Sequence, residues 1–215
     1  LVGDLCHERP GAFAQLGSIK LSDTDLNGVL GTVADLAKRT LPGADEVSVT
    51  LVDSGKGRTA ASTGELALEL DEWQYEAGHG PCLEASAGAV SVSVPEMATE
   101  TRWPDWASVA TRSGALSSLS IGMPVQDVVT GALNVYATTP HAFDSETITL
   151  ARTFSEYAAV ALGNAHLYDS TVTLAQQLRA AMDNRAVIEQ AKGIIMGDRR
   201  CTADEAFKIL VRLSQ

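Results

Sequence analysis

Two short stretches in the middle of the chain decide its fold: residues 119–125 read LSIGMPV and residues 131–137 read GALNVYA. In both stretches large apolar residues alternate with small or polar ones, which is typical of a β-strand, and residues 127–130 supply a turn between them. Residues 90–94 (VSVSV) alternate in the same way. These strands lie too close together in sequence for helical crossovers, so the pattern predicts an antiparallel sheet.

A further strand pair is expected upstream of these stretches. Apolar residues at positions 47, 49 and 51 alternate with polar ones, and residues 53–57 (DSGKG) form a turn. Residues 59–63 are then expected to return as the second strand of a hairpin.

Helices are expected on either side of the strands. Apolar residues at spacings of three and four predict a helix over 23–41, capped by Asp23 or Thr24 and ended by Pro42, and a short helix over 103–114. In the short helix, Trp103 and Trp106 are interpreted as a lid over the sheet. Asp144 caps a third, longer helix.

The last part of the chain differs in kind. From Leu174 to about residue 196 apolar residues keep helical spacing, and Thr202 and Glu205 form a capping-box pattern at the start of another helix, whose apolar face includes Phe207. Two possibilities stay open at this point. Either one helix runs unbroken from 145 to 196, or the helix is bent or interrupted near Gly163 or residues 171–173.

These patterns predict three parts: an N-terminal arm over residues 1–22, loose or a short helix; an α+β domain over 23–168, with an antiparallel sheet and flanking helices; and an all-α module over 169–215.

Composition limits the function classes. Of 215 residues, 45% are hydrophobic and 20% charged, which is ordinary globular usage, and no apolar stretch approaches the ~20 residues of a membrane span. Residues 1–20 lack the apolar core of a signal peptide. The three cysteines at 6, 82 and 201 form no CxxC pair, which favours a reducing cytoplasm over a disulfide scaffold.

The net charge of −11 would by itself argue against a nucleic-acid partner, but it is unevenly spread. Residues 1–173 carry 9 basic and 22 acidic side chains, whereas residues 174–215 carry 7 basic and 5 acidic ones. The basic character therefore belongs to the tail.

Several short motifs occur in a characteristic order: GPCLEA at 80–85, RWP at 102–104, RSG at 112–114, GALNVY at 131–136 and AFD at 142–144. In this order they resemble the GAF sensor domains of actinobacterial response regulators. The resemblance implies a six-stranded antiparallel sheet with helices on one face and a ligand pocket on the other. It also implies a possible small-molecule ligand and a homodimer formed through the terminal helices.

The tail carries a second resemblance. RAVIEQAKGIIM at 185–196, followed by ADEAF at 203–207, is similar to the ANTAR module, a transcription antiterminator that binds paired RNA stem-loops as a dimer. The sequence ends where the third helix of that module is expected, so the module is expected to be incomplete.

The resemblance and the basic lining of the tail together give a set of candidate RNA-binding residues. They are Arg185, Gln190, Lys192, Gly193, Arg199, Arg200, Lys208, Arg212, Ser214 and Gln215. Phosphate contacts by the cations would supply affinity and a strong salt dependence. Alternatives stay open: the cations could be a solvated side of a coiled coil, and Gly193 could serve the close approach of RNA or a partner helix, or tight helix packing within the tail.

Other readings of the α+β domain compete with a sensor. Cys82 follows His79 by three residues, so a Cys-His nucleophile and a GAF-type thiol reductase are possible, although a packed small side chain is the more common role. A dimerisation scaffold without RNA activity is a further alternative. No catalytic residue, metal site or cofactor is predicted.

Overall fold

The computed structural model describes residues 9–21, 23–53, 55–124 and 129–213. Contacts between residues divide the chain into two units, Leu1–Leu167 and Tyr168–Gln215. In chain order the elements are α1 (Arg9–Gly17), α2 (Leu26–Thr40), β1 (Glu46–Asp53), β2 (Lys56–Ser62), α3 (Glu65–Ala77), α4 (Pro81–Gly88), β3 (Ser91–Val94), the 3₁₀ helix η1 (Met97–Thr99), α5 (Pro104–Ser113), β4 (Ser117–Pro124), β5 (Val129–Ala137), α6 (Ser145–Arg199) and α7 (Ala203–Leu213).

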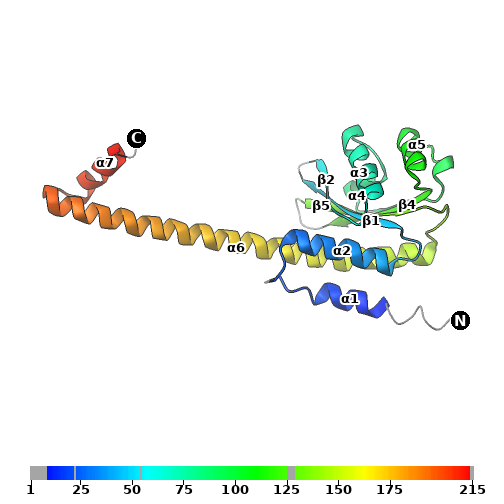
Figure 1. The fold of residues 1–215 in the computed structure, drawn as a ribbon, viewed down its shortest axis with the longest axis horizontal. Helices are drawn as coiled ribbons and strands as arrows, with labels where there is room; N and C mark the ends of the chain where they lie inside the picture. The colour runs from blue at the N-terminus through cyan, green and yellow to red at the C-terminus, as the bar shows by residue number, and fades with distance from the viewer. Residues whose placement is uncertain (1–8, 22, 54, 125–128, 214–215) are drawn as a thin grey trace. The chain divides into compact units, whose positions relative to one another are not determined.

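The first unit contains an antiparallel sheet in the order β2-β1-β5-β4-β3 (Figure 1). The predicted strands are all present. In the central strand β5, Val135 pairs with Val47 of β1 on one side and with Leu119 of β4 on the other. The resemblance implied six strands, but the described residues form a five-stranded sheet. Residues 65–88, which separate the second and third strands, form α3 and α4 instead.

One face of the sheet packs against α2 and α6 (Figure 1). The apolar residues that alternate along β1, β4 and β5 meet Val29 and Val33 of α2 and Phe154 and Leu162 of α6 in a single core. The cap of α2 is Asp25, whose side chain accepts a hydrogen bond of 2.8 Å from the Gly28 backbone N–H. The expected caps Asp23 and Thr24 were wrong, because the helix begins at Leu26 and the capping side chain must reach the third helical N–H.

The opposite face is covered by α3, α4 and α5 (Figure 1). The expectation of helices on one face only was therefore wrong. Trp103 and Trp106 are buried there, with Leu70 and Met97, and the Trp106 indole N–H donates to the Leu70 carbonyl at 3.3 Å.

Helix α6 begins in the first unit and ends in the second. Asp144 caps it as predicted, accepting from the Thr147 backbone N–H at 2.8 Å. The suggested weak points at Gly163 and residues 171–173 lie within one uninterrupted helix. Glycine and β-branched residues cost at most about 1 kcal/mol each inside a helix, which is too little to end one that is otherwise favourable.

The second unit consists of the C-terminal part of α6 and helix α7. The predicted capping box is confirmed: the Thr202 N–H donates to the Glu205 carboxylate at 2.9 Å, and the Glu205 N–H donates to Thr202 Oγ1 at 3.4 Å. Phe207 was expected in the core but is 47% exposed, because α7 buries only Ala206 fully against the described part of this chain.

Candidate functional site

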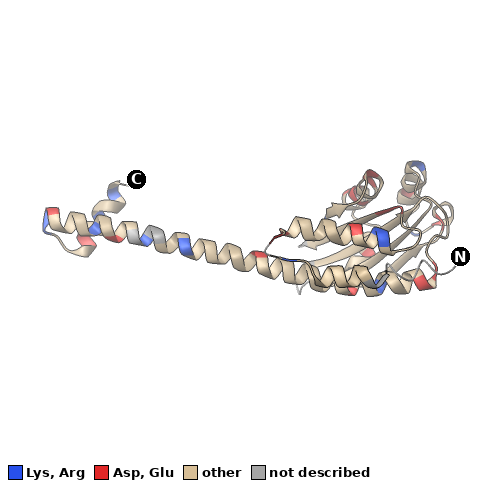
Figure 2. Cartoon of the chain, turned by 60° about the horizontal axis from the view of Figure 1, so that its bottom comes forward, with Lys and Arg blue, Asp and Glu red and all other residues tan. Residues whose placement is uncertain are grey.

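The predicted RNA-binding cations of α6 lie along one side of the helix. Arg185, Lys192 and Arg199 recur every seven residues, which is close to two helical turns. Lys192 pairs with Glu189 at 3.0 Å and Arg199 with Asp198 at 3.1 Å, while Arg185 is exposed and has no ion pair with a described side chain. Figure 2 shows the basic residues distributed along this part of α6 and on α7.

The remaining candidates occupy other places in the second unit. Gln190 is exposed but lies about 140° around α6 from Arg185, so the two do not share a side. Arg200 ends α6 with a φ of +50°, in the left-handed region that often terminates helices. On α7, Lys208 and Arg212 are exposed one turn apart. Ser214 and Gln215 lie outside the described residues.

Gly193 is exposed on α6. A Cβ added there would meet no atom within 4 Å, so packing inside the tail does not require a glycine at this position. The structure thus gives no support to helix packing within the tail as the reason for this glycine, and its role in an RNA contact stays a prediction.

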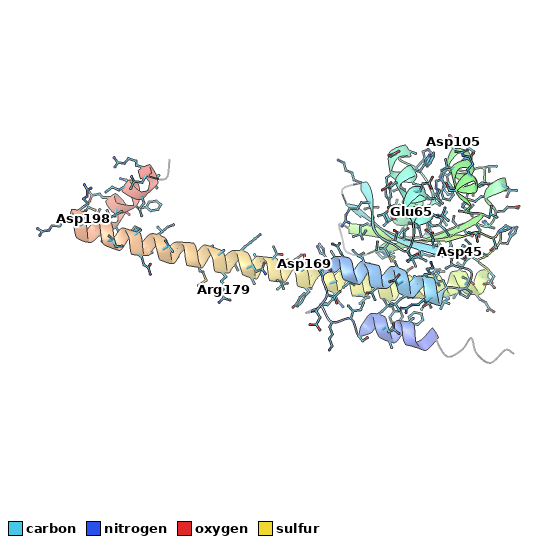
Figure 3. All side chains as sticks on the ribbon, viewed as in Figure 1. Asp45, Glu65, Asp105, Asp169, Arg179 and Asp198 are labelled. Carbon is cyan, nitrogen blue, oxygen red and sulfur yellow. The ribbon has the colours of Figure 1, made fainter. Side chains whose placement is uncertain are left out.

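The cations of α6 share their side with apolar residues, a feature that the sequence reasoning missed. Spacings of three and four define the α6 seam as Leu178, Ala181, Arg185, Ile188, Lys192 and Ile195. Leu178 is 58% exposed and Ile188 41%. This is the heptad spacing of a coiled-coil contact, in which basic residues occupy two positions. Arg179 projects from α6 (Figure 3). It lies about 100° around the helix from Leu178 and on the side away from Arg185, so it is outside this seam.

In the first unit, a buried polar cluster lies between the sheet and helix α3. It centres on Asp71, which is fully buried and accepts hydrogen bonds from Ser48 at 2.5 Å, Tyr136 at 2.7 Å and Thr59 and Asn134 at 3.1 Å. All four donors are neutral. Burial raises the pKa of Asp71 to about 6, although these hydrogen bonds oppose the shift.

Cys82 belongs to the same cluster. Its Sγ lies 3.2 Å from both Thr50 Oγ1 and Asn134 Nδ2, and it is fully buried. Burial and the nearby Asp71 carboxylate raise the pKa of the thiol to about 12, so the nucleophilic thiolate is scarce at neutral pH. His79 is exposed and packs edge-on against Trp73. The geometry therefore argues against a Cys-His nucleophile.

No direct signal in the sequence points to this cluster. Ser48 and Thr50 alternate with valines on β1, a pattern that also describes the solvent side of a strand. A usable signal was the helical spacing of Leu70, Asp71 and Gln74, which places polar residues on the packing side of α3.

A hollow of about 620 Å³ opens beside the start of α4. Its walls include His79 and Leu83 from the α4 region, Trp103, and Val52 and Thr130 from the strand ends. Its size is within the range of small-molecule pockets. Among the described residues no group of three or more His, Cys, Asp or Glu is placed to hold a metal ion, and no described helix is long and apolar enough to cross a membrane.

Comparison with known proteins assigns both parts of the chain. The GAF domain family matches residues 23–163, and the ANTAR domain family matches residues 176–215. The sheet with its two helical layers and the basic helical unit thus define a sensory domain followed by a nucleic-acid-binding module. The chain belongs to the GAF domain family and carries an ANTAR domain after its GAF domain. This is the architecture of a regulator with a sensory domain and an RNA-binding antitermination module.

Solved structures show the same fold at low sequence identity. The free methionine-R-sulfoxide reductase from Neisseria meningitidis is 18% identical, with a TM-score of 0.58 over 76% of this chain and 90% of that one. The phycocyanobilin-bound GAF domain from a cyanobacterial phytochrome is 16% identical, with a TM-score of 0.55 over 74% and 96%. The GAF domain of a phosphoenolpyruvate-protein phosphotransferase from Coxiella burnetii is 17% identical, with a TM-score of 0.54 over 76% and 97%. A search of curated proteins found no match.

Proposed function

We propose that this chain is a signal-responsive antitermination regulator whose second unit binds paired RNA stem-loops through the basic side of α6 and the exposed cations of α7. The observation that carries the proposal is the seven-residue recurrence of Arg185, Lys192 and Arg199 on one side of a helix. Such a row matches a phosphate backbone that passes along the helix. The proposed RNA is a nascent transcript, and the proposed place of action is the cytoplasm.

The energetics of the proposed contact come mainly from phosphate. Each neutralised phosphate adds roughly 0.7–0.9 to the slope of log affinity against log salt. Within residues 176–215, which match the ANTAR family, one described aromatic side chain is available for base stacking: Phe207 on α7, outside the row of α6 cations. Sequence preference therefore falls chiefly to Arg, Lys and Gln side chains that reach base edges in the loops.

The proposed active form is a homodimer. The exposed Leu178 and Ile188 of the α6 seam support this, because a heptad-spaced apolar row on a helix is normally covered by a second helix. In such a pair the long Arg185 and Lys192 side chains would extend past the apolar contact, so each copy would still offer these cations to a stem-loop.

The proposed sensory input is a small molecule in the hollow beside α4. A ligand there can act only if it binds two conformations of the chain with different affinities. We further propose that the chain is not an enzyme, since its buried Cys82 thiol is shielded from substrate by the packing around it. Turnover of an oxidised small molecule that is lost in Cys82→Ser would contradict this.

RNA binding by the full chain tests the proposal. Affinity for paired stem-loops is measured against an unstructured RNA of equal length over a salt series. We expect selective binding, and a loss of at least tenfold with a lower salt slope in the Arg185→Ala, Lys192→Ala double variant, because two phosphate contacts disappear.

Arg179→Ala is the matched control, since it removes an exposed cation of the same helix outside the seam. An equal loss of log affinity per removed charge in the control and the double variant would mean that the tail attracts RNA only by its overall charge. Equal weak binding to both RNAs would overturn the proposal.

A further inference from the structure

On the α6 side of the sheet in the first unit, the two helices α2 and α6 are too narrow together to cover all five strands. A helix is about 10 Å wide and strands are about 4.8 Å apart, so α2 and α6 together cover about four strands. Strand β3 is the fifth and lies at the sheet edge. Its Val92 and Val94 belong to the core on the other face, which leaves Ser91 toward the α6 side.

A groove of about 770 Å³ occupies this uncovered corner, entirely within the first unit. One wall is a stripe of α6 that runs from Arg152 to Asn164. The other wall comes from Val90 and Ser91 at β3 and from Ile121 on β4. Its volume lies in the range that holds small ligands.

The groove contains a buried hydroxyl without a partner. Ser155 is 2% exposed and its Oγ makes no hydrogen bond. Two threonines of the same helix do bond back to the chain: Thr149 donates to the Ser145 carbonyl at 2.8 Å and Thr153 to the Thr149 carbonyl at 3.1 Å. An unpaired buried hydroxyl costs about 1–3 kcal/mol, so a ligand group that accepts a hydrogen bond from Ser155 would recover a bond that the described chain does not supply.

Two charges flank this hydroxyl. Arg152 and Glu156 are one turn apart on α6 and line the same groove, and neither forms an ion pair with a described side chain. One end of the groove thus offers a cation, an anion and a hydroxyl, while Val90, Ile121 and Ala159 give the rest an apolar character.

We propose that this groove binds an amphipathic zwitterion, namely an apolar amino acid or a short apolar peptide with free termini. The carboxylate contacts Arg152 and accepts a hydrogen bond from Ser155, the ammonium group contacts Glu156, and the apolar body lies on Val90 and Ile121. This site is separate from the hollow beside α4, and the inference does not depend on RNA binding.

Calorimetric titration of the full chain without RNA tests the inference. The probes are L-leucine, L-phenylalanine and the dipeptide leucyl-phenylalanine, together with the N-acetylated and the C-amidated dipeptide. Binding of the free dipeptide at one site is expected, with each capped form about tenfold weaker because one charge-assisted hydrogen bond is lost. If a free amino acid binds as tightly as the dipeptide, the ligand is a free amino acid. If only the dipeptide binds, the ligand is a short peptide.

Variants connect the binding to the groove. Arg152→Gln and Glu156→Gln are each expected to weaken the free dipeptide about tenfold. Ser155→Ala should weaken it while leaving Tm unchanged or higher, because the unpaired hydroxyl contributes nothing to the free chain. Thr153→Ala is the control, as its hydroxyl is already satisfied within the helix.

Three outcomes would overturn the inference: no binding of any probe, equal affinity for free and capped dipeptide, or unchanged affinity in all three groove variants. Sedimentation of the same variants measures their oligomeric state and tests whether a second copy of the chain occupies the groove instead. A change of oligomeric state without any binding heat would mean that the groove is covered by a second copy of the chain.

Discussion

At the scale of single residues, Asp71 is the most unusual feature of the first unit. A fully buried carboxylate normally has a cationic partner, whereas the four donors to Asp71 are neutral hydroxyl and amide groups. The consequence is a folded-state pKa of about 6, above the ordinary value of about 3.9. Asp71 therefore favours folding only while it is protonated.

The stability of the first unit should accordingly depend on pH with a definite sign. Between about pH 4 and 6 the folded chain binds the Asp71 proton more tightly than the unfolded chain, so the free energy of unfolding falls as the pH rises. The expected loss is on the order of 2–3 kcal/mol, complete above pH 6. Urea unfolding at a series of pH values measures it.

Asp71→Asn removes the titrating group, so this part of the pH dependence should disappear. Glu72→Gln, an exposed neighbour on α3, is the control and should keep it. If Asp71→Asn retains the full fall between pH 4 and 6, another group is responsible.

The buried polar cluster could not be predicted from the sequence. Ser48 and Thr50 carry the same alternation whether the strand faces water or a polar helix, so only the position of α3 distinguishes the two cases.

In the second unit, the side of the helix on which the cations lie was easier to predict. A seven-residue spacing fixes Arg185 and Lys192 on one side of any helix, but it does not reveal that this side is also apolar.

At the scale of elements, prediction succeeded where local signals were strong and independent of tertiary packing. The capping box of α7 and the alternating strands are of this kind. The sequence pattern predicts neither α3 nor α4, because the apolar side of α3 includes Asp71 and Gln74, and α4 is only eight residues long. Tertiary partners, rather than periodicity, stabilise these two helices.

Helix α6 offers a test at Gly193. Replacement by alanine should stabilise the helix by about 1 kcal/mol, because no atom lies within 4 Å of the new methyl group. If RNA approaches the backbone there, the same change should lower RNA affinity several-fold. Hydrogen exchange of the α6 amides and RNA titration measure the two effects.

Gly31→Ala in α2 is the matched control, since that glycine is also helical and has open space around it. It should raise helix protection in the first unit without affecting RNA. Unchanged RNA affinity in Gly193→Ala would show that the glycine is not at the RNA contact.

At the scale of the whole molecule, the proposed RNA contact and the proposed dimer contact share the α6 seam, so the two are expected to be linked. In a parallel pair of α6 helices, Arg185 and Lys192 would each face their own copy across the seam, and like charges in such positions weaken the association. An RNA phosphate near these cations removes part of that repulsion. Linkage requires the effect to be reciprocal, so RNA tightens the dimer by the factor by which dimerisation tightens RNA binding.

Sedimentation of the full chain with and without paired stem-loop RNA measures this coupling. We expect the dimer dissociation constant to fall when RNA is added, by a factor that shrinks as salt rises and screens the repulsion. Replacing Arg185 and Lys192 by leucine should give a tight dimer without RNA and abolish the coupling, whereas Arg179→Leu should leave both unchanged. The contrary outcome is a dimer dissociation constant that is the same with and without RNA at every salt concentration. This outcome would show that the seam cations do not lie in the dimer contact. The RNA-binding side of α6 would then have to be independent of its apolar row.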